Sequence, residues 1–509
     1  MKKRINLLVV AIFSVFILNA QNIKTVARFE TDLNDGLREE HIFKHNSGNF
    51  AVLRSSERSE GGENTYVFTK YNNKLEEQSA EEIKISKKFK IYAKVENGGL
   101  FHVMFIREIN KQDFIICTYN IITHKAKTTE GTMPKKFHFD YLYNGNNGSF
   151  LNATVMGNNF LVKGRIKKNP MIFSIDMESG NYTDFVLTIN GVKPKRTNLV
   201  TFVNLPETNE FACMVTAQMT RRVMAEYVYI FNEKSELIHT VAMKDKSNLF
   251  MKSMTGAKIS DSKYVFTGAY TTSYVPEGIY IVTTNGSEVL KSNFIGYTKL
   301  QNFFKFVSEK AAAKIEKRKE KLESKGKEMV YNNYITIHPL MVLSDNEFLF
   351  LGEFYTPQYH TETTGTGNNR TTRRVFDGNA YTEAVCVKFD DNANVIWDNL
   401  IRLNPGYWPM TENKFVTVKL DDKNISLLYS EKNSIHLNIL DYEGRTKSDA
   451  IKQMFTEANE NEEVKKTMGV IEYWYDNYFI QYGIQKLKEQ DGGLFAKRRL
   501  VYFINKLEN

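Results

Sequence analysis

The nearest pair of histidines in the sequence is His41 and His45, four residues apart. This spacing places two side chains on one face of a helix, where they can share a metal ion. The residues that lead into Asn46-Ser47-Gly48 are typical of a strand, and the other seven histidines are dispersed along the chain. We therefore expect no metal site.

Adjacent acidic residues are the next candidates for chemistry, because paired carboxylates can act as general acid and base. The pairs at 390–391, 421–422 and 462–463 each lie in a predicted turn, where Asp and Asn side chains commonly bond to the backbone. The metalloprotease, nucleophile-elbow and P-loop motifs (HExxH, GxSxG and GxxxxGK[ST]) do not occur. We expect no catalytic residues, no cofactor and no enzymatic activity.

The segment 404–410 is a Pro- and Gly-containing loop that carries Tyr407 and Trp408. Aromatic side chains displayed on a loop can stack against a ligand such as a sugar ring. The alternative is a packed connection between two structural repeats. The three cysteines, Cys117, Cys213 and Cys386, each lie in an apolar run, which favours buried thiols over a metal or redox pair, with one disulfide left open.

The elements that must position these residues form a recurring unit of two strands separated by a loop and followed by an Asx- or Gly-containing turn. Eight first strands are predicted at 48–53, 99–105, 159–162, 209–215, 263–270, 346–354, 424–429 and 477–482. Their partners are predicted at 66–75, 114–119, 171–176, 227–237, 278–286, 384–395, 435–444 and 500–505.

The repeat length of roughly fifty to sixty residues is the size of a four-stranded propeller blade. The segment 388–397, with its Asx-rich turn and Val395-Ile396-Trp397 strand, resembles the hairpin of PQQ-like and related bacterial propeller repeats; 231–237 and 440–445 are weaker copies. The resemblance implies an all-β chain with seven or eight blades in one domain over 21–509. The strand 25–29 is expected to pair with 500–504. Two unrelated β-rich domains are the alternative.

A charged α-helix is predicted to interrupt the repeats within 302–330, because Glu, Lys, Arg and Ala dominate this segment. We call it the charged arm. Its apolar residues gather in the first half, and this end is expected either to dock on the propeller or to bind a partner protein. The residues concerned are Phe303, Phe304, Phe306, Val307 and Ile315. A second interruption at 356–380, the polar insertion, is expected to be a long exposed loop.

The first twenty residues read as a secretory signal, with a basic start, an apolar run and cleavage before Gln21. Its removal leaves 65 basic and 59 acidic residues, a net charge of +6, too weak to indicate nucleic-acid binding. No later segment is apolar enough to span a membrane. Asn19-Ala20-Gln21 and the Asn-, Lys- and Tyr-rich strands resemble secreted proteins of Bacteroidota, so we expect a periplasmic or outer-membrane location.

These observations lead to a functional expectation: a non-catalytic exported propeller that acts as a protein-interaction scaffold, or as an accessory subunit of an envelope assembly for secretion, motility or nutrient uptake. Envelope proteins would then be its partners. The alternative is a glycan-binding or glycan-active propeller that uses Tyr407 and Trp408.

Overall fold

The computed structural model describes residues 23–33, 37–56, 60–108, 112–139, 153–187, 189–205, 208–220, 223–243, 249–344, 346–365, 370–453, 462–489 and 497–509, with backbone alone at 37–40 and 452–453. The predicted signal 1–20 and Gln21 lie outside these residues. Among the residues described, no helix has the length and apolar character needed to cross a bilayer.

The described chain is almost entirely β, with eight antiparallel sheets and a single α-helix. It divides into two compact units, one made of residues 33–415 and the other of residues 1–32 together with 416–509. We number the sheets in chain order, sheets 1 to 6 in the larger unit and sheets 7 and 8 in the smaller.

Each sheet of the larger unit has four or five strands. Sheet 1 contains β2 (Leu37–Lys44), β3 (Phe50–Ser56), β4 (Glu63–Tyr71) and β5 (Glu77–Ser86). Sheet 2 contains β6 (Phe89–Asn97), β7 (Leu100–Arg107), β8 (Asp113–Asn120) and β9 (Lys125–Thr132). Sheet 3 contains β10 (Phe137–Phe139), β11 (Ala153–Met156), β12 (Asn159–Ile166), β13 (Asn169–Asp176) and β14 (Tyr182–Val186). Sheet 4 contains β15 (Thr197–Asn204), β16 (Phe211–Gln218), β17 (Met224–Phe231) and β18 (Leu237–Ala242). Sheet 5 contains β19 (Phe250–Met251), β20 (Thr255–Lys258), β21 (Tyr264–Thr271), β22 (Gly278–Thr284) and β23 (Val289–Gly296). Sheet 6 contains β24 (Tyr334–Ile337), β25 (Met341–Ser344), β26 (Glu347–Thr364), β27 (Thr371–Asp390) and β28 (Val395–Arg402). Short 3₁₀ helices occur at Pro194–Arg196 and Tyr297–Lys299.

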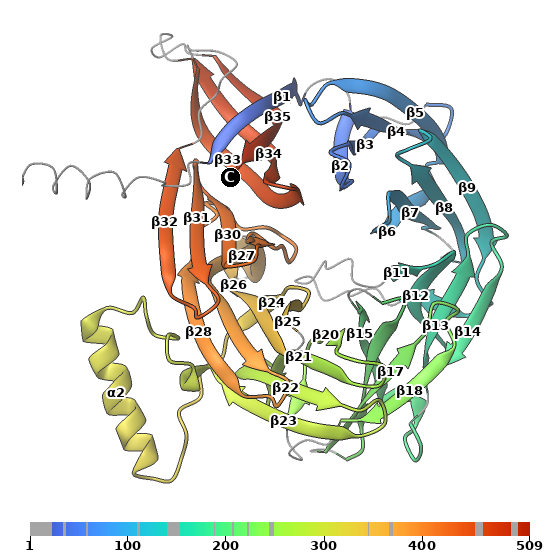
Figure 1. The fold of residues 1–509 in the computed structure, drawn as a ribbon. Coiled ribbons are helices and arrows are strands. Elements are labelled where there is room, and N and C mark those ends of the chain that lie inside the picture. Colours follow the sequence, from blue (N-terminus) through green and yellow to red (C-terminus); the bar gives the residue numbers. More distant parts are fainter. Residues whose placement is uncertain are drawn as a thin grey trace, which may run out of the picture. The chain divides into compact units, whose positions relative to one another are not determined.

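The two middle strands of each sheet are the strand pairs that the sequence predicts. β16, for example, is buried along almost its whole length, whereas the outer strand β5 alternates between exposed and half-buried residues. A strand buried on both faces needs a neighbouring sheet on each side. Five apolar clusters supply this packing, and each joins one sheet to the next in chain order, as Phe68 of sheet 1 stacks on Tyr119 of sheet 2 at 4.7 Å. Figure 1 shows the sheets of this unit following one another along the chain.

The turn between the third and fourth strands recurs with the same geometry in several sheets. In sheet 1 the Asn72 side chain accepts hydrogen bonds from the backbone N–H groups of residues 74 and 76, at 2.9 and 3.0 Å. Asn232, Asp390 and Asp441 do the same in sheets 4, 6 and 7. The turns in sheets 4, 6 and 7 lie in the segments that resemble propeller hairpins, and the acidic residues at 390 and 441 bond to the backbone of the turn.

The antiparallel order also fixes which loops share an end of the sheets. The hairpins between the second and third strands, such as 272–277 in sheet 5, lie at the same end as the connections from one sheet to the next, such as 297–333 between sheets 5 and 6 and 403–416 after sheet 6. We call this the connection end. Both interruptions of the repeat pattern, the charged arm and the polar insertion, emerge there.

The charged arm is helical over a shorter range than 302–330, and the polar insertion is not the irregular loop that was predicted. α2 covers Glu309–Glu323 and begins after Ser308, which has an extended backbone, and the residues from 300 to 307 before it form turns and bends. None of its residues is buried, and Figure 1 shows it standing apart from the sheets. The polar insertion is an antiparallel ribbon, since residues 356–364 continue β26 and residues 371–380 continue β27. Its Thr-rich alternation and cross-strand ion pairs favour strands over an irregular loop.

The smaller unit contains sheet 7, with β29 (Thr417–Leu420), β30 (Asn424–Glu431), β31 (Ser434–Asp441) and β32 (Thr446–Gln453), and sheet 8, with β33 (Glu462–Tyr475), β34 (Tyr478–Glu489), β35 (Arg498–Glu508) and β1 (Lys24–Asp32). An apolar cluster that includes Leu437 and Phe479 joins them. β1 pairs antiparallel with β35, with Phe29 opposite Ile504, which confirms the pairing expected for the strand 25–29.

Candidate functional site

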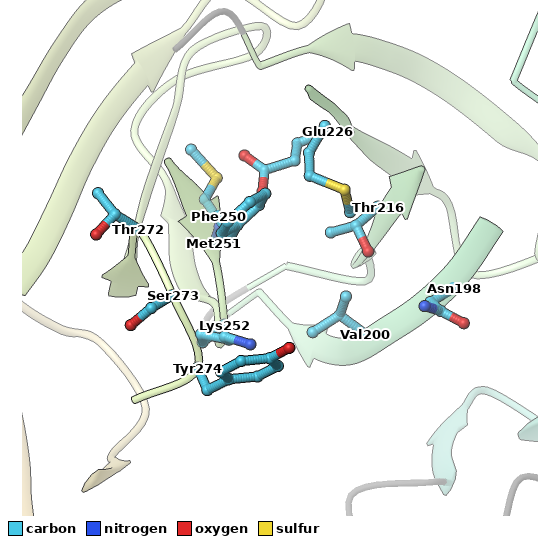
Figure 2. Close-up of a pocket in the computed structure, with 11 residues that line it drawn as sticks. Asn198, Val200, Thr216, Glu226, Phe250, Met251, Lys252, Thr272, Ser273 and Tyr274 are labelled. Carbon is cyan, nitrogen blue, oxygen red and sulfur yellow. The ribbon is translucent and has the colours of Figure 1, made fainter. Parts of the chain in front are cut away.

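A pocket of about 740 Å³ opens between sheets 4 and 5 at the connection end. Strands β15, β16, β17 and β19 and the loop after β21 supply its walls (Figure 2). The residues that line it are Asn198, Val200, Thr216, Met224, Glu226, Phe250, Met251, Lys252, Thr272, Ser273 and Tyr274. Its volume is within the range of small-molecule sites, which are typically apolar with a few placed polar groups.

Glu226 is the buried acid of this pocket, with 2% of its surface exposed. It shares a face of β17 with Val228 and Ile230, both packed against sheet 5, and lies opposite Thr216 on β16. Its Oε1 accepts a hydrogen bond from the backbone N–H of Met251 at 2.6 Å. This bond fixes the carboxylate and joins the free edge of β19 to sheet 4.

Lys252 and Tyr274 lie at the rim. In the view of Figure 2 they face Glu226 and Phe250 across the open space. The Lys252 backbone N–H donates to the carbonyl of Ala269 at 2.8 Å, so its position is set by β21. Burial holds the pKa of the Lys252 amine below its ordinary value, against the opposite influence of the Glu226 charge. Tyr274 is 88% exposed and presents a free aromatic ring to ligand or solvent.

A second set of polar side chains lies in sheet 6, beneath the 403–416 connection. Glu353 is fully buried, lies 2.7 Å from His338 Nε2 through its Oε1, and accepts the backbone N–H of Phe415 at 2.9 and 3.0 Å. Burial keeps the pKa of His338 below its ordinary value, despite the neighbouring carboxylate. The arrangement anchors the end of the connection to β26.

Glu412 and Lys414 complete this set. The Tyr355 hydroxyl donates to Glu412 Oε1 at 2.6 Å, and burial raises the pKa of the Glu412 carboxyl. Burial lowers the pKa of the Lys414 amine, although Glu353 and Glu412 act in the opposite direction. These contacts join one connection to one strand, so we assign the set a structural role.

The five residues predicted to bind a partner do not form one surface. Phe303 is buried in the cluster between sheets 5 and 6, where it stacks on Tyr297 at 5.6 Å, and Phe304 packs against the same cluster. Phe306 is 38% exposed, Val307 is half-buried, and Ile315 lies half-buried on α2. The first two side chains therefore anchor the charged arm.

The two residues predicted to stack on a ligand, Tyr407 and Trp408, have different environments. Tyr407 packs edge-on against Phe415 at 5.6 Å, and burial raises the pKa of its hydroxyl to about 12. Trp408 is 51% exposed, while its backbone lies tightly against Gly378, where a Cβ would come within 2.4 Å of the Trp408 carbonyl oxygen. Of the two side chains, Trp408 is the exposed one.

The three cysteines are buried and form no disulfide, in agreement with the prediction of buried thiols. Burial raises the pKa of Cys117 and of Cys386 to about 12, so neither is a reactive thiolate. Within the described part of the chain, no three His, Cys, Asp or Glu residues come together to hold a metal ion. His41 packs against Phe43 at 4.6 Å.

Sequence analysis missed Glu226 and Lys252. A signal for Glu226 is present, because it occupies the same alternation as Val228 and Ile230 in a strand whose inward positions are otherwise apolar. A charged residue in such a register marks either an error of register or a functional position. Lys252 carries no comparable signal, since β19 is only two residues long.

No protein-family model matches the chain, and no curated protein matches it in sequence. Solved structures share its fold class. A eukaryotic initiation factor is 10% identical over 91% of this chain and 90% of its own, with a TM-score of 0.38. The β-propeller domain of the Trilobed protease from Pyrococcus furiosus is 9% identical over 86% and 98%, with a TM-score of 0.35. A puromycin-hydrolyzing peptidase from Mycobacterium tuberculosis is 9% identical over 81% and 53%, with a TM-score of 0.39.

The chain is thus all-β with propeller-like neighbours. The expectation of a non-catalytic interaction scaffold is contradicted, because several of the similar structures are peptidases, and we withdraw it. The likeness is one of fold, and at these identities it assigns no activity to the chain.

Proposed function

We propose that the chain is a ligand-binding protein whose site is the pocket between sheets 4 and 5. The observation that carries the proposal is a fixed, buried carboxylate, Glu226, within a largely apolar cavity of about 740 Å³. The ligand is a small amphipathic organic molecule that covers the apolar wall and presents its polar end to the polar residues of the lining.

The packing of the two sheets supports this proposal. The cluster around Val228, Tyr264 and Tyr280 packs sheet 4 against sheet 5. At the connection end the cluster gives way to the pocket, where Met224 and Phe250 are only half-buried. Half-exposed apolar side chains around a carboxylate gain stability when a ligand covers them.

The test is ligand-observed NMR on purified protein with a library of small amphipathic fragments. Ser273→Trp fills the pocket from its rim, and Ser287→Trp is the matched control, since this exposed serine lies in the other loop of the same sheet, at the opposite end. We expect fragments that bind the wild type and Ser287→Trp but not Ser273→Trp. Fragments that bind all three proteins equally, or no binding fragment at all, would contradict the proposal.

We further propose that the eight sheets are eight blades, the higher of the two counts expected, and that the chain is exported from a Bacteroidota-type cell to the periplasm or outer membrane. The eight predicted strand pairs, each at the middle of one sheet, support the count. The leader-like residues 1–20 support export. Intact-mass measurement of protein from the host envelope tests export, with a mature chain beginning at Gln21 expected and an unprocessed chain as the contrary result.

A further inference from the structure

The helix α2 has its charged residues sorted by sign around its axis. Residues three, four or seven positions apart share a face of a helix. By this spacing the acidic residues of α2 lie on one face, which we call the acidic face: Glu309, Glu316, Glu320 and Glu323. Most of its cations lie on another, which we call the basic face: Lys310, Lys314, Lys317, Arg318 and Lys321.

A narrow apolar stripe borders the basic face. It consists of Ala311, Ile315 and Leu322, which are four and seven residues apart. Arg318 is three residues after Ile315 and four residues before Leu322, so the stripe and the basic face are neighbours on the helix surface. A helix that carries Lys and Arg beside an apolar stripe is typical of segments that lie in the interface between a bilayer and water.

These faces of α2 are open to an external surface. None of its residues is buried, and the helix stands apart from the sheets (Figure 1). Lys319 pairs with Glu316 of the acidic face at 3.7 Å, whereas in the described part of the chain the five cations of the basic face form no ion pair. A helix of 15 residues without tertiary packing is marginally stable in water, so a surface that covers it would stabilise it.

The base of the charged arm adds exposed apolar side chains to the same connection. Phe306 precedes α2, and Val330 and Tyr331 follow it where the chain returns to sheet 6; all three are exposed. Tyrosine is enriched at the interface between bilayer and water, where its ring lies at the level of the headgroups. Apolar groups are therefore available next to the helix for contact with lipid.

We propose that α2 binds the surface of an anionic lipid bilayer, with its basic face and apolar stripe toward the lipid and its acidic face toward water. Lipid suits this helix better than a protein partner, because Lys and Ala are depleted in protein interfaces, whereas each Lys or Arg close to an anionic bilayer contributes to binding. No residue of α2 lines the pocket between sheets 4 and 5, so this inference is independent of the proposed ligand-binding function.

The experiment is cosedimentation of the chain of residues 21–509 with lipid vesicles. The first twenty residues are omitted because their apolar run could itself insert into lipid. The vesicles contain phosphatidylcholine alone or phosphatidylcholine mixed with phosphatidylglycerol. We expect the chain to bind the vesicles that contain phosphatidylglycerol, to bind them more weakly as the salt concentration rises, and to remain in solution with phosphatidylcholine alone.

Two double variants with the same change in total charge locate the binding surface. Lys317→Gln with Lys321→Gln removes two charges from the basic face and keeps helix-forming residues, so affinity for the anionic vesicles should fall about tenfold or more. Lys125→Gln with Lys127→Gln changes two exposed residues of β9 and should keep the wild-type affinity. Both variants should keep the wild-type thermal midpoint, because all four side chains are exposed.

Several results would overturn the inference. Binding to neither kind of vesicle, or equal binding to both, would exclude an anionic bilayer as the partner. Equal weakening in the two double variants would attribute binding to the total charge of the protein and not to α2. Polyaspartate serves as a probe for an acidic protein: if it binds in a manner that depends on Lys317 and Lys321 while the vesicles do not bind, the basic face recognises protein and not lipid.

Discussion

His102 is a buried residue whose environment makes stability depend on pH. It is fully buried in β7, with Nδ1 2.9 Å from the Thr118 hydroxyl oxygen, and burial lowers its pKa to about 4 from an ordinary value of 6.5. Between these two values the unfolded chain binds more protons than the folded chain. Stability should therefore fall as the pH decreases from 6.5 to 4, by up to about 3 kcal/mol.

Urea unfolding of the wild type and of His102→Gln at pH 7 and pH 4.5 measures this contribution. The variant should lose less stability on acidification than the wild type, because one buried group no longer requires protonation on unfolding. His138→Gln, at an exposed position, is the control and should keep the wild-type response. An unchanged response in His102→Gln would show that other groups account for the acid sensitivity.

Gly268 allows β21 to approach the short connection between β19 and β20, which contains Ser253. A Cβ at this position would lie 2.0 Å from the carbonyl oxygen of Ser253, whose hydroxyl in turn accepts the Ala269 N–H. Gly268→Ala should lower the free energy of unfolding by about 1–3 kcal/mol, since backbone must move. Gly296→Ala is the contrast: its nearest neighbour would be 3.8 Å away at φ −61°, so it should be neutral or slightly stabilising.

Thermal melts monitored by circular dichroism distinguish the two glycine variants. A lower midpoint for Gly268→Ala alone is the expected result, and similar midpoints for both would indicate that the backbone around Ser253 adjusts without cost.

At the scale of single residues the sequence predicts the Asx turns, because their hydrogen bonds lie within five residues. It does not predict Glu226 as a ligand group, because its partner Met251 is 25 residues away in another sheet.

The ribbon formed by the ends of β26 and β27 is an element held mainly by its own contacts. His360 Nδ1 lies 2.5 Å from Asp377, Arg373 bonds Glu362 at 2.6 Å, and the Arg374 guanidinium lies 3.9 Å from the centroid of Tyr359. Replacement of residues 359–377 by Asn-Gly, which favours a tight hairpin turn, should move the thermal midpoint by less than about 2 °C.

A substitution in β26 below the ribbon provides the comparison that distinguishes the ribbon from the core of sheet 6. Glu353→Ala removes the acceptor of the buried Phe415 N–H and the partner of His338, and should cost about 3 kcal/mol. If shortening the ribbon destabilises the protein as much as Glu353→Ala does, the ribbon is part of the core of sheet 6 and the interpretation is wrong.

The elements that the sequence predicts well are those with strong local patterns. The middle strands combine apolar runs with flanking turns, and the charged arm combines helix-forming residues with a Ser-Lys-Gly ending, so both are visible in a short window. The first and last strands of the sheets cannot be recognised in such a short window. β19 has two residues and β14 is largely exposed, and each exists because a longer neighbour offers a backbone edge. Tertiary pairing, rather than local preference, decides these strands.

At the scale of the whole molecule, the order of the sheets within each unit follows the order of the repeats, because each strand pair packs against the next one along the chain in that unit. Five apolar clusters in the larger unit and one in the smaller unit record this sequential packing. The exception is β1, which crosses from the start of the chain to the last sheet. Stability of sheet 8 should therefore depend on residues far from it in sequence.

β1 supplies more than backbone bonds to sheet 8. The Arg28 guanidinium donates to Asn505 Oδ1 at 3.0 Å and to Gln485 Oε1 at 2.7 Å, and both amides are buried. Without β1 these groups lose their partner and β35 becomes an exposed edge, which promotes aggregation. A chain of residues 34–509 should unfold more than about 10 °C below a chain of residues 21–509, or aggregate. A synthetic peptide of residues 22–33 should raise the midpoint of the shorter chain, and the same peptide with Arg28→Ala should do so less effectively. Equal midpoints for the two chains would mean that β34 and β35 need no fourth strand, and equal rescue by both peptides would limit the role of β1 to its backbone.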